Sequence, residues 1–99
     1  MSGSKTYCIY IMASDRNGTL YIGVTNNLLR RVTRHRNGTA SDFTRRYHVR
    51  RLVYYEAFTH IGDAILREKR LKKWKRQWKI RLIEQANPKW LDLYETLVG

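Results

Sequence analysis

The chain has 99 residues, enough for one domain with a single hydrophobic core. Twenty Lys and Arg against eight Asp and Glu give a formal net charge of +12. This charge favours nucleic acid as the partner over a membrane surface, because no apolar run approaches the roughly 20 residues of a membrane span. The single cysteine, Cys8, excludes an internal disulfide and is expected to pack as a small apolar residue. No secretion signal is visible, which predicts a cytoplasmic protein.

Two short apolar segments, residues 7–13 and 20–24, flank a polar stretch that contains Asn17-Gly18. This dipeptide supplies the positive φ angles of tight turns, so the segments predict a β-hairpin. Side chains alternate between the two faces of a strand, and one face is expected to carry Tyr10, Met12, Tyr21 and Gly23. The opposite face is expected to meet the core through Ile9, Ile11, Leu20, Ile22 and Val24.

A basic helix is expected to follow the hairpin, over residues 28 to about 36. Polar side chains at residues 25–27 can cap its start, and Asn-Gly at 37–38 marks its end. Arg31 and His35 are four residues apart and therefore share one helix face. The residues expected to face the core are Leu28, Leu29 and Val32.

The middle of the chain is expected to hold a loop and a third strand. Residues 39–48 show no helical or strand periodicity, and they place Arg45 and Arg46 between two aromatic residues. We expect this stretch to be a loop that meets a ligand or packs across the sheet edge. Residues 52–58 are rich in apolar and aromatic residues and predict a strand.

A long helix is expected to begin with Asp63 as its N-cap and to end at Pro88 at the latest. Spacing of 100° per residue gives one apolar stripe, formed by Ala64, Leu71, Trp74, Trp78 and Leu82. Glu68 falls at the edge of this stripe, in a region where nine of the fifteen residues from 67 to 81 are Lys or Arg. Asn87 and Pro88 are expected to be the N-cap and first-turn proline of a short terminal helix.

Five residues together supply the groups that phosphodiester hydrolysis needs: Tyr10, Tyr21, Arg31, His35 and Glu68. A carboxylate can hold Mg²⁺, an arginine can neutralise charge on the phosphate, and a tyrosine or histidine can relay a proton. Each group also has a structural interpretation. Tyrosine is common in strands, basic helix faces are usually solvated, and Glu68 has the spacing for a salt bridge to Lys72. The three histidines lack the spacing of zinc ligands.

These residues resemble the motifs of the GIY-YIG endonuclease superfamily, and in length and detail those of its small single-domain bacterial members, the YhbQ-like group. Cys-Ile-Tyr at 8–10 stands at the place of the first motif, and Tyr-Ile-Gly at 21–23 is the second motif unaltered. Arg31 and His35 follow at the positions of the helix motif. The resemblance covers about residues 6–93.

The resemblance implies a single α/β domain over residues 1–99, with a three-stranded antiparallel sheet flanked by helices. It also implies a nuclease site with one divalent metal ion, Mg²⁺ or Mn²⁺, bound by Glu68 at the place of the family's metal-binding glutamate. Arg31 would stabilise the phosphorane-like transition state. Tyr10, Tyr21 and His35 would position and deprotonate the attacking water, with Tyr21 slightly favoured as the base.

Two further positions of the resemblance are expected to be structural. Gly23 would allow close passage of the backbone where the strand turns towards the helix, and Asn87 stands near the family's late asparagine. The chain departs from the family pattern at two places. Cys8 replaces the glycine of the first motif, and Val24 stands where some relatives carry a lysine that lowers the pKa of a tyrosine.

Phosphate contacts are expected from eight basic residues: Arg30, Arg34, Arg45, Arg46, Lys72, Lys75, Arg76 and Lys79. Such contacts position a strand without reading its sequence, so we expect weak or structure-directed selectivity, with DNA as the favoured substrate. Trp74 and Trp78 could stack on bases, but their helical spacing favours a place in the core.

The main alternative is a noncatalytic nucleic-acid binding module that keeps the nuclease fold and the positive charge. It predicts binding that depends on salt but on neither a metal ion nor Glu68. A basic protein that docks on an acidic protein surface is a third possibility, and it has no support beyond the net charge of +12.

Overall fold

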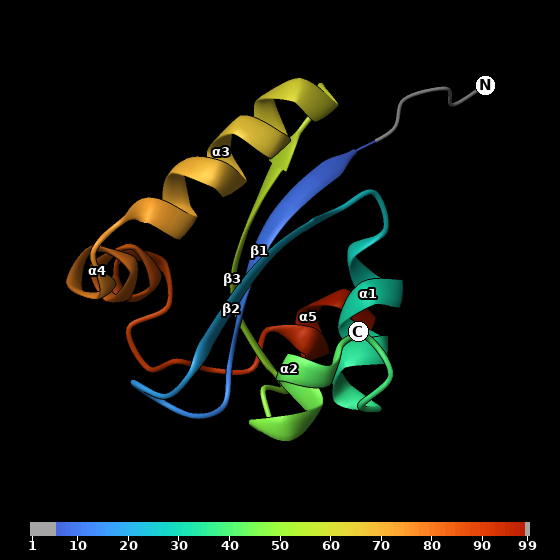
Figure 1. The fold of residues 1–99 in the computed structure, drawn as a ribbon, viewed down its shortest axis with the longest axis vertical. Helices are drawn as coiled ribbons and strands as arrows, with labels where there is room; N and C mark the ends of the chain where they lie inside the picture. Colours follow the sequence, from blue (N-terminus) through green and yellow to red (C-terminus); the bar gives the residue numbers. More distant parts are fainter. Residues whose placement is uncertain (1–5, 99) are drawn as a thin grey trace.

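The computed structural model describes residues 6–98, which form a three-stranded antiparallel sheet with helices on both faces (Figure 1). The elements follow in the order β1 Tyr7–Ala13, β2 Leu20–Thr25, α1 Leu28–Arg36, α2 Asp42–Arg46, β3 Arg51–Phe58, α3 Ile61–Lys73, α4 Arg76–Ala86 and α5 Tyr94–Val98. The strand order is β2-β1-β3, so β1 is central. This architecture confirms the predicted α/β fold with its three-stranded antiparallel sheet.

The β1–β2 hairpin has the predicted register. Tyr10 pairs with Gly23 and Met12 with Tyr21, so these four residues share one sheet face. The turn between the strands is closed by a hydrogen bond from the backbone N–H of Gly18 to the carbonyl oxygen of Asp15, at 2.9 Å. Asn17 adopts the left-handed conformation with φ of 56°, as its tolerance of positive φ leads one to expect.

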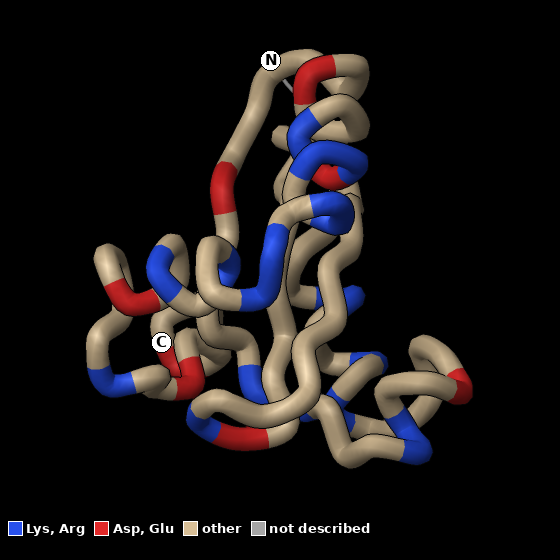
Figure 2. The backbone as a smooth tube through the Cα atoms, turned by 60° about the vertical axis from the view of Figure 1, so that its left-hand side comes forward, with Lys and Arg blue, Asp and Glu red and all other residues tan. Residues whose placement is uncertain are grey.

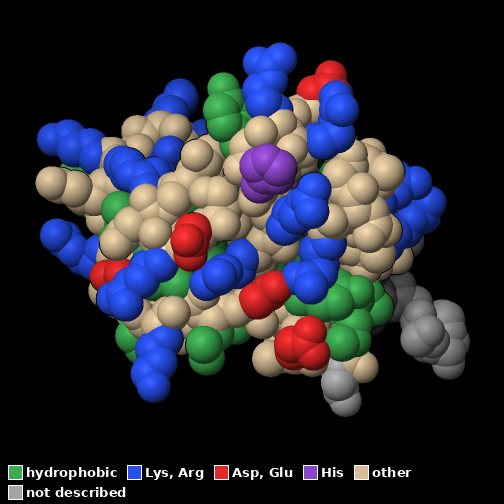
Figure 3. All heavy atoms as spheres, turned by 90° about the horizontal axis from the view of Figure 1, so that it is seen from below, with side chains coloured by type: hydrophobic (Ala, Val, Ile, Leu, Met, Phe, Trp, Pro, Cys, Tyr) green, Lys and Arg blue, Asp and Glu red, His purple; other side chains and the backbone are tan. Residues whose placement is uncertain are grey.

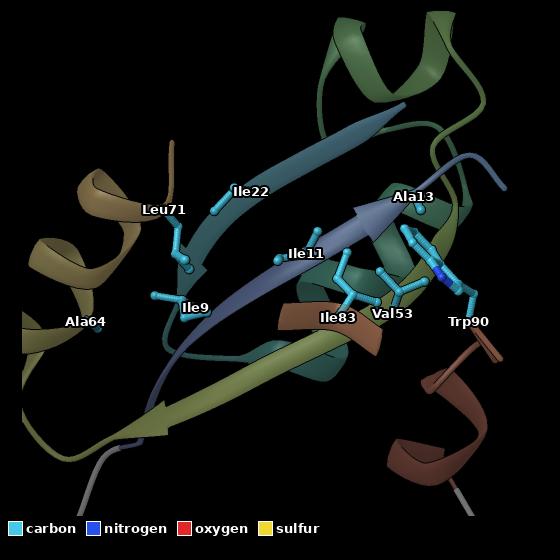
Figure 4. Packing of buried hydrophobic residues seen from close by; sticks show 9 residues of the cluster. All are labelled: Ile9, Ile11, Ala13, Ile22, Val53, Ala64, Leu71, Ile83 and Trp90. Carbon is cyan, nitrogen blue, oxygen red and sulfur yellow. The ribbon is translucent and has the colours of Figure 1, made fainter. Parts of the chain in front are cut away.

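Both faces of the sheet are buried, because β1 lies between two layers of helices. On one face, Ile9 and Ile11 pack against α3 and α4 through Ala64, Leu71 and Ile83 (Figure 4). On the other face, Tyr10 and Met12 pack with residues of α1, β3 and α5. The predicted core face is confirmed, and the tyrosine face forms a second apolar cluster.

The basic helix α1 has the predicted bounds, Leu28–Arg36. The side chain of Asn27 caps it by accepting a hydrogen bond from the backbone N–H of Arg30, at 3.1 Å. Val32 is buried as expected, but Leu29 is exposed, so its predicted core position is wrong. Adjacent residues of a helix point about 100° apart, and here only Leu28 packs against the cluster below the helix.

The stretch predicted to be a loop, residues 39–48, contains the short helix α2. Ser41 is its N-cap, and its hydroxyl accepts a hydrogen bond from the backbone N–H of Thr44, at 3.1 Å. Five helical residues are too few to show a periodic pattern, so only the capping serine and the Asp42 beside it indicated a helix.

The predicted long helix is divided into α3 and α4. Trp74 and Lys75 are extended, with ψ near 149° and 148°, and the two helices point in different directions (Figure 1). No proline or glycine marks the break. The guanidinium of Arg76 instead donates to the backbone carbonyls of Asn17 and Gly18 in the hairpin turn, at 2.7 Å each. Long-range contacts of this kind override a local helical pattern.

The N-cap predictions for Asp63 and Asn87 are both wrong. The helix α3 begins at Ile61, so Asp63 lies within its first turn, where the helix dipole favours a negative charge. Asn87 is the C-cap of α4, and the terminal helix begins at Tyr94 rather than at Pro88. None of the helices within residues 6–98 is both long enough and apolar enough to cross a bilayer.

Asn87 joins the end of α4 to the sheet. Its buried side-chain amide donates to the carbonyl oxygens of Val53 and Leu91, at 3.0 and 2.9 Å, and its Oδ1 accepts the backbone N–H of Leu91 at 2.9 Å. These bonds fix the chain that follows α4 against β3. The asparagine is thus fully occupied within the fold.

Candidate active site

The centre of the site is a buried pair formed by Tyr10 of β1 and His35 of α1. The Tyr10 hydroxyl and His35 Nε2 are 2.9 Å apart, His35 is fully buried and Tyr10 is 1% exposed. Gly23 lies opposite Tyr10 on β2. A Cβ atom on Gly23 would lie 2.5 Å from the Tyr10 hydroxyl oxygen, so the glycine leaves room for the tyrosine ring. The close neighbour at this glycine is therefore the side chain of Tyr10.

Thr44 of α2 completes the surroundings of His35. Its hydroxyl lies 3.0 Å from His35 Nδ1 and 2.9 Å from the Ser41 hydroxyl, and it is 3.3 Å from the Ser41 carbonyl oxygen. One proton arrangement satisfies every group. Thr44 donates to the Ser41 carbonyl and accepts from His35 Nδ1–H, so that Nε2 accepts from the Tyr10 hydroxyl. Thr44 was not among the residues predicted from the sequence, although its place three residues after the capping Ser41 is a signal of a helix start.

Burial sets the protonation of this pair. Desolvation, with the positive charge of Arg31 adding to it, lowers the pKa of His35 to about 4. Desolvation also raises the pKa of Tyr10, and the nearby Tyr21 and Glu68 reinforce this effect while Arg31 opposes it. At neutral pH the pair therefore consists of a neutral imidazole and a protonated phenol. Tyr10 is poorly suited to act as the base by ionising.

Tyr21 lies at the more open side of the pair. Its ring centroid is 5.0 Å from the His35 ring and 6.3 Å from the Tyr10 ring, and its side chain is half-buried. Phe43 of α2 extends this aromatic wall, with a ring-centroid distance of 6.1 Å to Tyr21. The structure thus brings together both motif tyrosines and the histidine, and it places Tyr21 where water can reach it.

Arg31 borders a cationic hollow of about 200 Å³ at the start of α1. The other residues that line it are Thr25, Asn26, Asn27, Arg30 and Arg34. Three arginines and no carboxylate line this hollow, which makes it suited to a phosphate oxygen. Arg31 acts on the pKa of both Tyr10 and His35, so this cation lies next to the buried pair.

Glu68 reaches the site from α3. Its side chain is only 15% exposed, and its charge contributes to the raised pKa of Tyr10. Lys72 Nζ lies 3.1 Å from its carboxylate, which is the salt bridge that helical spacing predicted. Within residues 6–98 there is no cluster of three or more His, Cys, Asp or Glu. A single carboxylate suits Mg²⁺, which keeps several waters and takes phosphate oxygens, better than it suits Zn²⁺.

All eight predicted phosphate-binding residues are exposed. Four of them also have partners within the chain, and one of these is Lys72, which pairs with Glu68. Arg45 pairs with Asp42 at 3.1 Å, Arg76 binds the hairpin turn, and Lys79 Nζ lies 3.4 Å from the Lys72 carbonyl oxygen. Figure 2 shows Lys and Arg residues at many places along the backbone. On the face shown in Figure 3, Lys and Arg side chains are spread over the surface and outnumber those of Asp and Glu.

The three-stranded antiparallel sheet with helices on both faces can be compared with known families. The model of the GIY-YIG catalytic domain matches residues 6–81, and the chain belongs to the GIY-YIG family. The predicted resemblance is therefore confirmed. Small UPF0213 proteins are among the relatives, and the one from Clostridium perfringens is 37% identical over 81 residues, which cover 82% of this chain and 86% of that one.

Other relatives extend this group. A UPF0213 protein of Pseudomonas aeruginosa is 35% identical over 79 residues, 80% of this chain and 75% of that one. Another UPF0213 protein, of Autographa californica nuclear polyhedrosis virus, is 39% identical over 83 residues, which cover 82% of this chain and 79% of that one. The relatives thus come from a virus as well as from bacteria. The solution NMR structure of a UPF0213 protein from Bacillus halodurans matches with a TM-score of 0.53 and 28% identity, covering 83% of this chain and 86% of that one.

Proposed function

We propose that the protein is a divalent-metal-dependent endonuclease that hydrolyses phosphodiester bonds in DNA or structured nucleic acid. The observation that carries the proposal is the buried Tyr10–His35 pair, with a hydrogen bond of 2.9 Å. Arg31 acts on the pKa of both residues, and Glu68 acts on the pKa of Tyr10. Burying a histidine and a tyrosine together costs stability unless they are hydrogen-bonded to each other. A cation and a carboxylate beside such a pair fit phosphate chemistry better than they fit packing.

In this proposal Glu68 would hold the metal ion, which would supply Lewis-acid stabilisation of negative charge. Arg31, at the cationic hollow, binds a phosphate oxygen and stabilises the charge that builds up during attack. Tyr10 keeps its proton and donates a hydrogen bond to His35, so a lone pair of its oxygen accepts a hydrogen bond from the attacking water. Tyr21, on the open side, acts as the base in its phenolate form, takes the proton of that water and becomes a neutral phenol.

The phosphate contacts proposed around this site are those of Arg30 and Arg34 on α1, Arg45 and Arg46 at the end of α2, and the four basic residues Lys72, Lys75, Arg76 and Lys79. Contacts to phosphates do not distinguish one base from another, so they do not read the nucleotide sequence. We therefore propose weak or structure-directed selectivity.

The test is a nuclease assay of purified wild type, Glu68→Ala and Arg31→Ala on branched, single-stranded and duplex DNA with Mg²⁺. We expect wild type to cleave at least one substrate and each variant to be slower by about 10²- to 10³-fold. Glu95→Gln, which changes an exposed acid on α5, is the matched control and should cleave like wild type. Equal residual cleavage in wild type, Glu68→Ala and Arg31→Ala would indicate a contaminating nuclease and end the proposal.

One observation favours the noncatalytic binding module as a second candidate: Lys72 already neutralises Glu68, at 3.1 Å. An occupied carboxylate binds a metal ion only if the lysine moves away. NMR titration with Mg²⁺ or Mn²⁺ separates the two candidates. Shifts or broadening at the amides around Glu68 support the nuclease, and an unperturbed spectrum supports the binding module.

A further inference from the structure

A groove runs along the outer side of α4, remote from the tyrosine face of the sheet. Its volume is about 230 Å³, and it is lined by Trp74, Trp78, Arg81, Leu82 and Gln85. Residues 78, 81, 82 and 85 repeat at helical spacing, on the side of α4 opposite Ile80 and Ile83, which pack into the core. The expected core position of Trp78 is therefore wrong, since its side chain is 46% exposed.

The two tryptophans are held in a defined arrangement. Their rings meet edge to face, with centroids 6.1 Å apart and an interplanar angle of 82°. Trp74 packs against the core, and the guanidinium of Arg67 lies 5.3 Å from its ring. Arg67 is fixed in turn by two hydrogen bonds to Glu56 of β3, at 3.0 and 2.8 Å. Trp74, on which the ring of Trp78 rests, is thus itself supported by the core and by Arg67.

The charges around the groove are positive. Lys75 Nζ lies 5.7 Å from the Trp78 ring, and Arg81 lines the groove itself. The nearest acid on α4 is Glu84, whose carboxylate accepts a hydrogen bond from Trp90 Nε1 at 2.7 Å. An occupant that matches these groups has a flat π surface and a neighbouring negative charge. An unpaired nucleotide has both.

We propose that this groove binds an unpaired base of a single-stranded segment, stacked on Trp78, with the adjoining phosphates at Lys75 and Arg81. This proposal rests on the proposed nuclease function, and the feature of the substrate that it adds is an unpaired base. The contact of Lys79 with the Lys72 carbonyl joins the first turn of α4 to the end of α3, one turn beyond Glu68.

The test compares two oligonucleotides of equal length, an oligothymidine and an abasic strand with the same phosphates, by fluorescence anisotropy in EDTA so that nothing is cleaved. Wild type should prefer the oligothymidine by roughly ten-fold or more, and its tryptophan fluorescence should be quenched by the oligothymidine alone. Trp78→Leu, which keeps apolar bulk without the π surface, should lose the preference. Trp78→Phe should retain most of it, and Tyr55→Ala, at an exposed aromatic residue of β3, should retain all of it.

Equal affinity of wild type for the two strands would overturn the proposal, and so would a preference that Trp78→Leu preserves. The wild-type comparison remains decisive even if a variant fails to fold. A concentration-dependent dimer in sedimentation that Trp78→Leu abolishes, together with equal affinity for both strands, would assign the groove to a second copy of the chain. Glu68→Ala separates this proposal from the nuclease proposal, because it should abolish cleavage and leave the base preference unchanged.

Discussion

At the scale of single residues, the contact between Gly23 and the ring of Tyr10 decides whether the buried pair can form. Gly23→Ala places a Cβ atom 2.5 Å from the Tyr10 hydroxyl oxygen, so either the ring or the strand must shift. We expect a loss of about 1–3 kcal/mol in the free energy of unfolding, measured by urea denaturation, as for other overpacked cores.

The matched control is Gly62→Ala in the first turn of α3. No atom lies within 4 Å of the Cβ position there, so this variant should be neutral, or stabilised by up to about 1 kcal/mol through better helix propensity. If both alanine variants are as stable as wild type, Tyr10 does not depend on the glycine.

His35 makes the stability depend on pH. Burial lowers its pKa to about 4, below the ordinary value of 6.5, so the unfolded chain binds more protons than the folded one between these values. Stability should therefore be fully present above pH 6.5 and fall as the pH drops towards 4. The loss that His35 contributes is at most about 3 kcal/mol.

The measurement is urea unfolding of wild type and His35→Gln at pH 7, 5.5 and 4.5. The glutamine variant does not titrate in this range, so the stability difference between the two proteins should shrink as the pH falls. A difference that stays constant over the three pH values would show that His35 titrates alike in the folded and unfolded states.

Thr44 is a positioning residue that acts through His35. Thr44→Val keeps the shape of the side chain and removes the hydroxyl that contacts His35 Nδ1 at 3.0 Å. We expect a loss of about 1–3 kcal/mol in stability, a lower kcat and an unchanged KM. Thr44→Ser restores the hydroxyl and should restore kcat. A serine variant as slow as the valine variant would assign Thr44 to packing alone.

At the scale of elements, local signals predicted the parts of the fold that depend on neighbouring residues. The alternation in β1 and β2, the Asn17-Gly18 turn and the cap at Asn27 each act within a few residues. The break between α3 and α4 could not be predicted in this way. It coincides with contacts of Arg76 to the hairpin turn, 58 and 59 residues earlier in the chain.

The role of Asn87 also depends on contacts with distant residues, which local sequence signals do not predict. An asparagine before a proline is typical of an N-cap, yet its side chain joins β3 and the chain beyond α4 through three hydrogen bonds. Asn87→Ala should cost about 2–3 kcal/mol in urea unfolding, because buried backbone groups lose their partner. Gln77→Ala on the exposed surface of α4 is the control and should change stability by less than about 0.5 kcal/mol. Equal effects of the two substitutions would contradict the proposed anchoring.

At the scale of the whole molecule, the candidate site draws on separate parts of the chain. Tyr10 comes from β1, Tyr21 from β2, His35 and Arg31 from α1, and Glu68 from α3. The hairpin pattern alone predicted that the two tyrosines share a face, and helical spacing predicted the same for Arg31 and His35. The approach of Glu68 to Tyr10 was expected only from the family resemblance, because it depends on how α3 packs across the sheet.

The central claim is that Glu68 and a divalent metal ion together make this chain a nuclease. The most direct measurement is single-turnover cleavage of a labelled branched DNA by wild type and Glu68→Gln over a Mg²⁺ titration from EDTA to saturation. We predict that wild-type cleavage rises with Mg²⁺ and is abolished by EDTA, while Glu68→Gln remains at least about 10²-fold slower at every concentration. Cleavage by wild type that persists in EDTA, or a glutamine variant with the wild-type Mg²⁺ dependence, would contradict the claim.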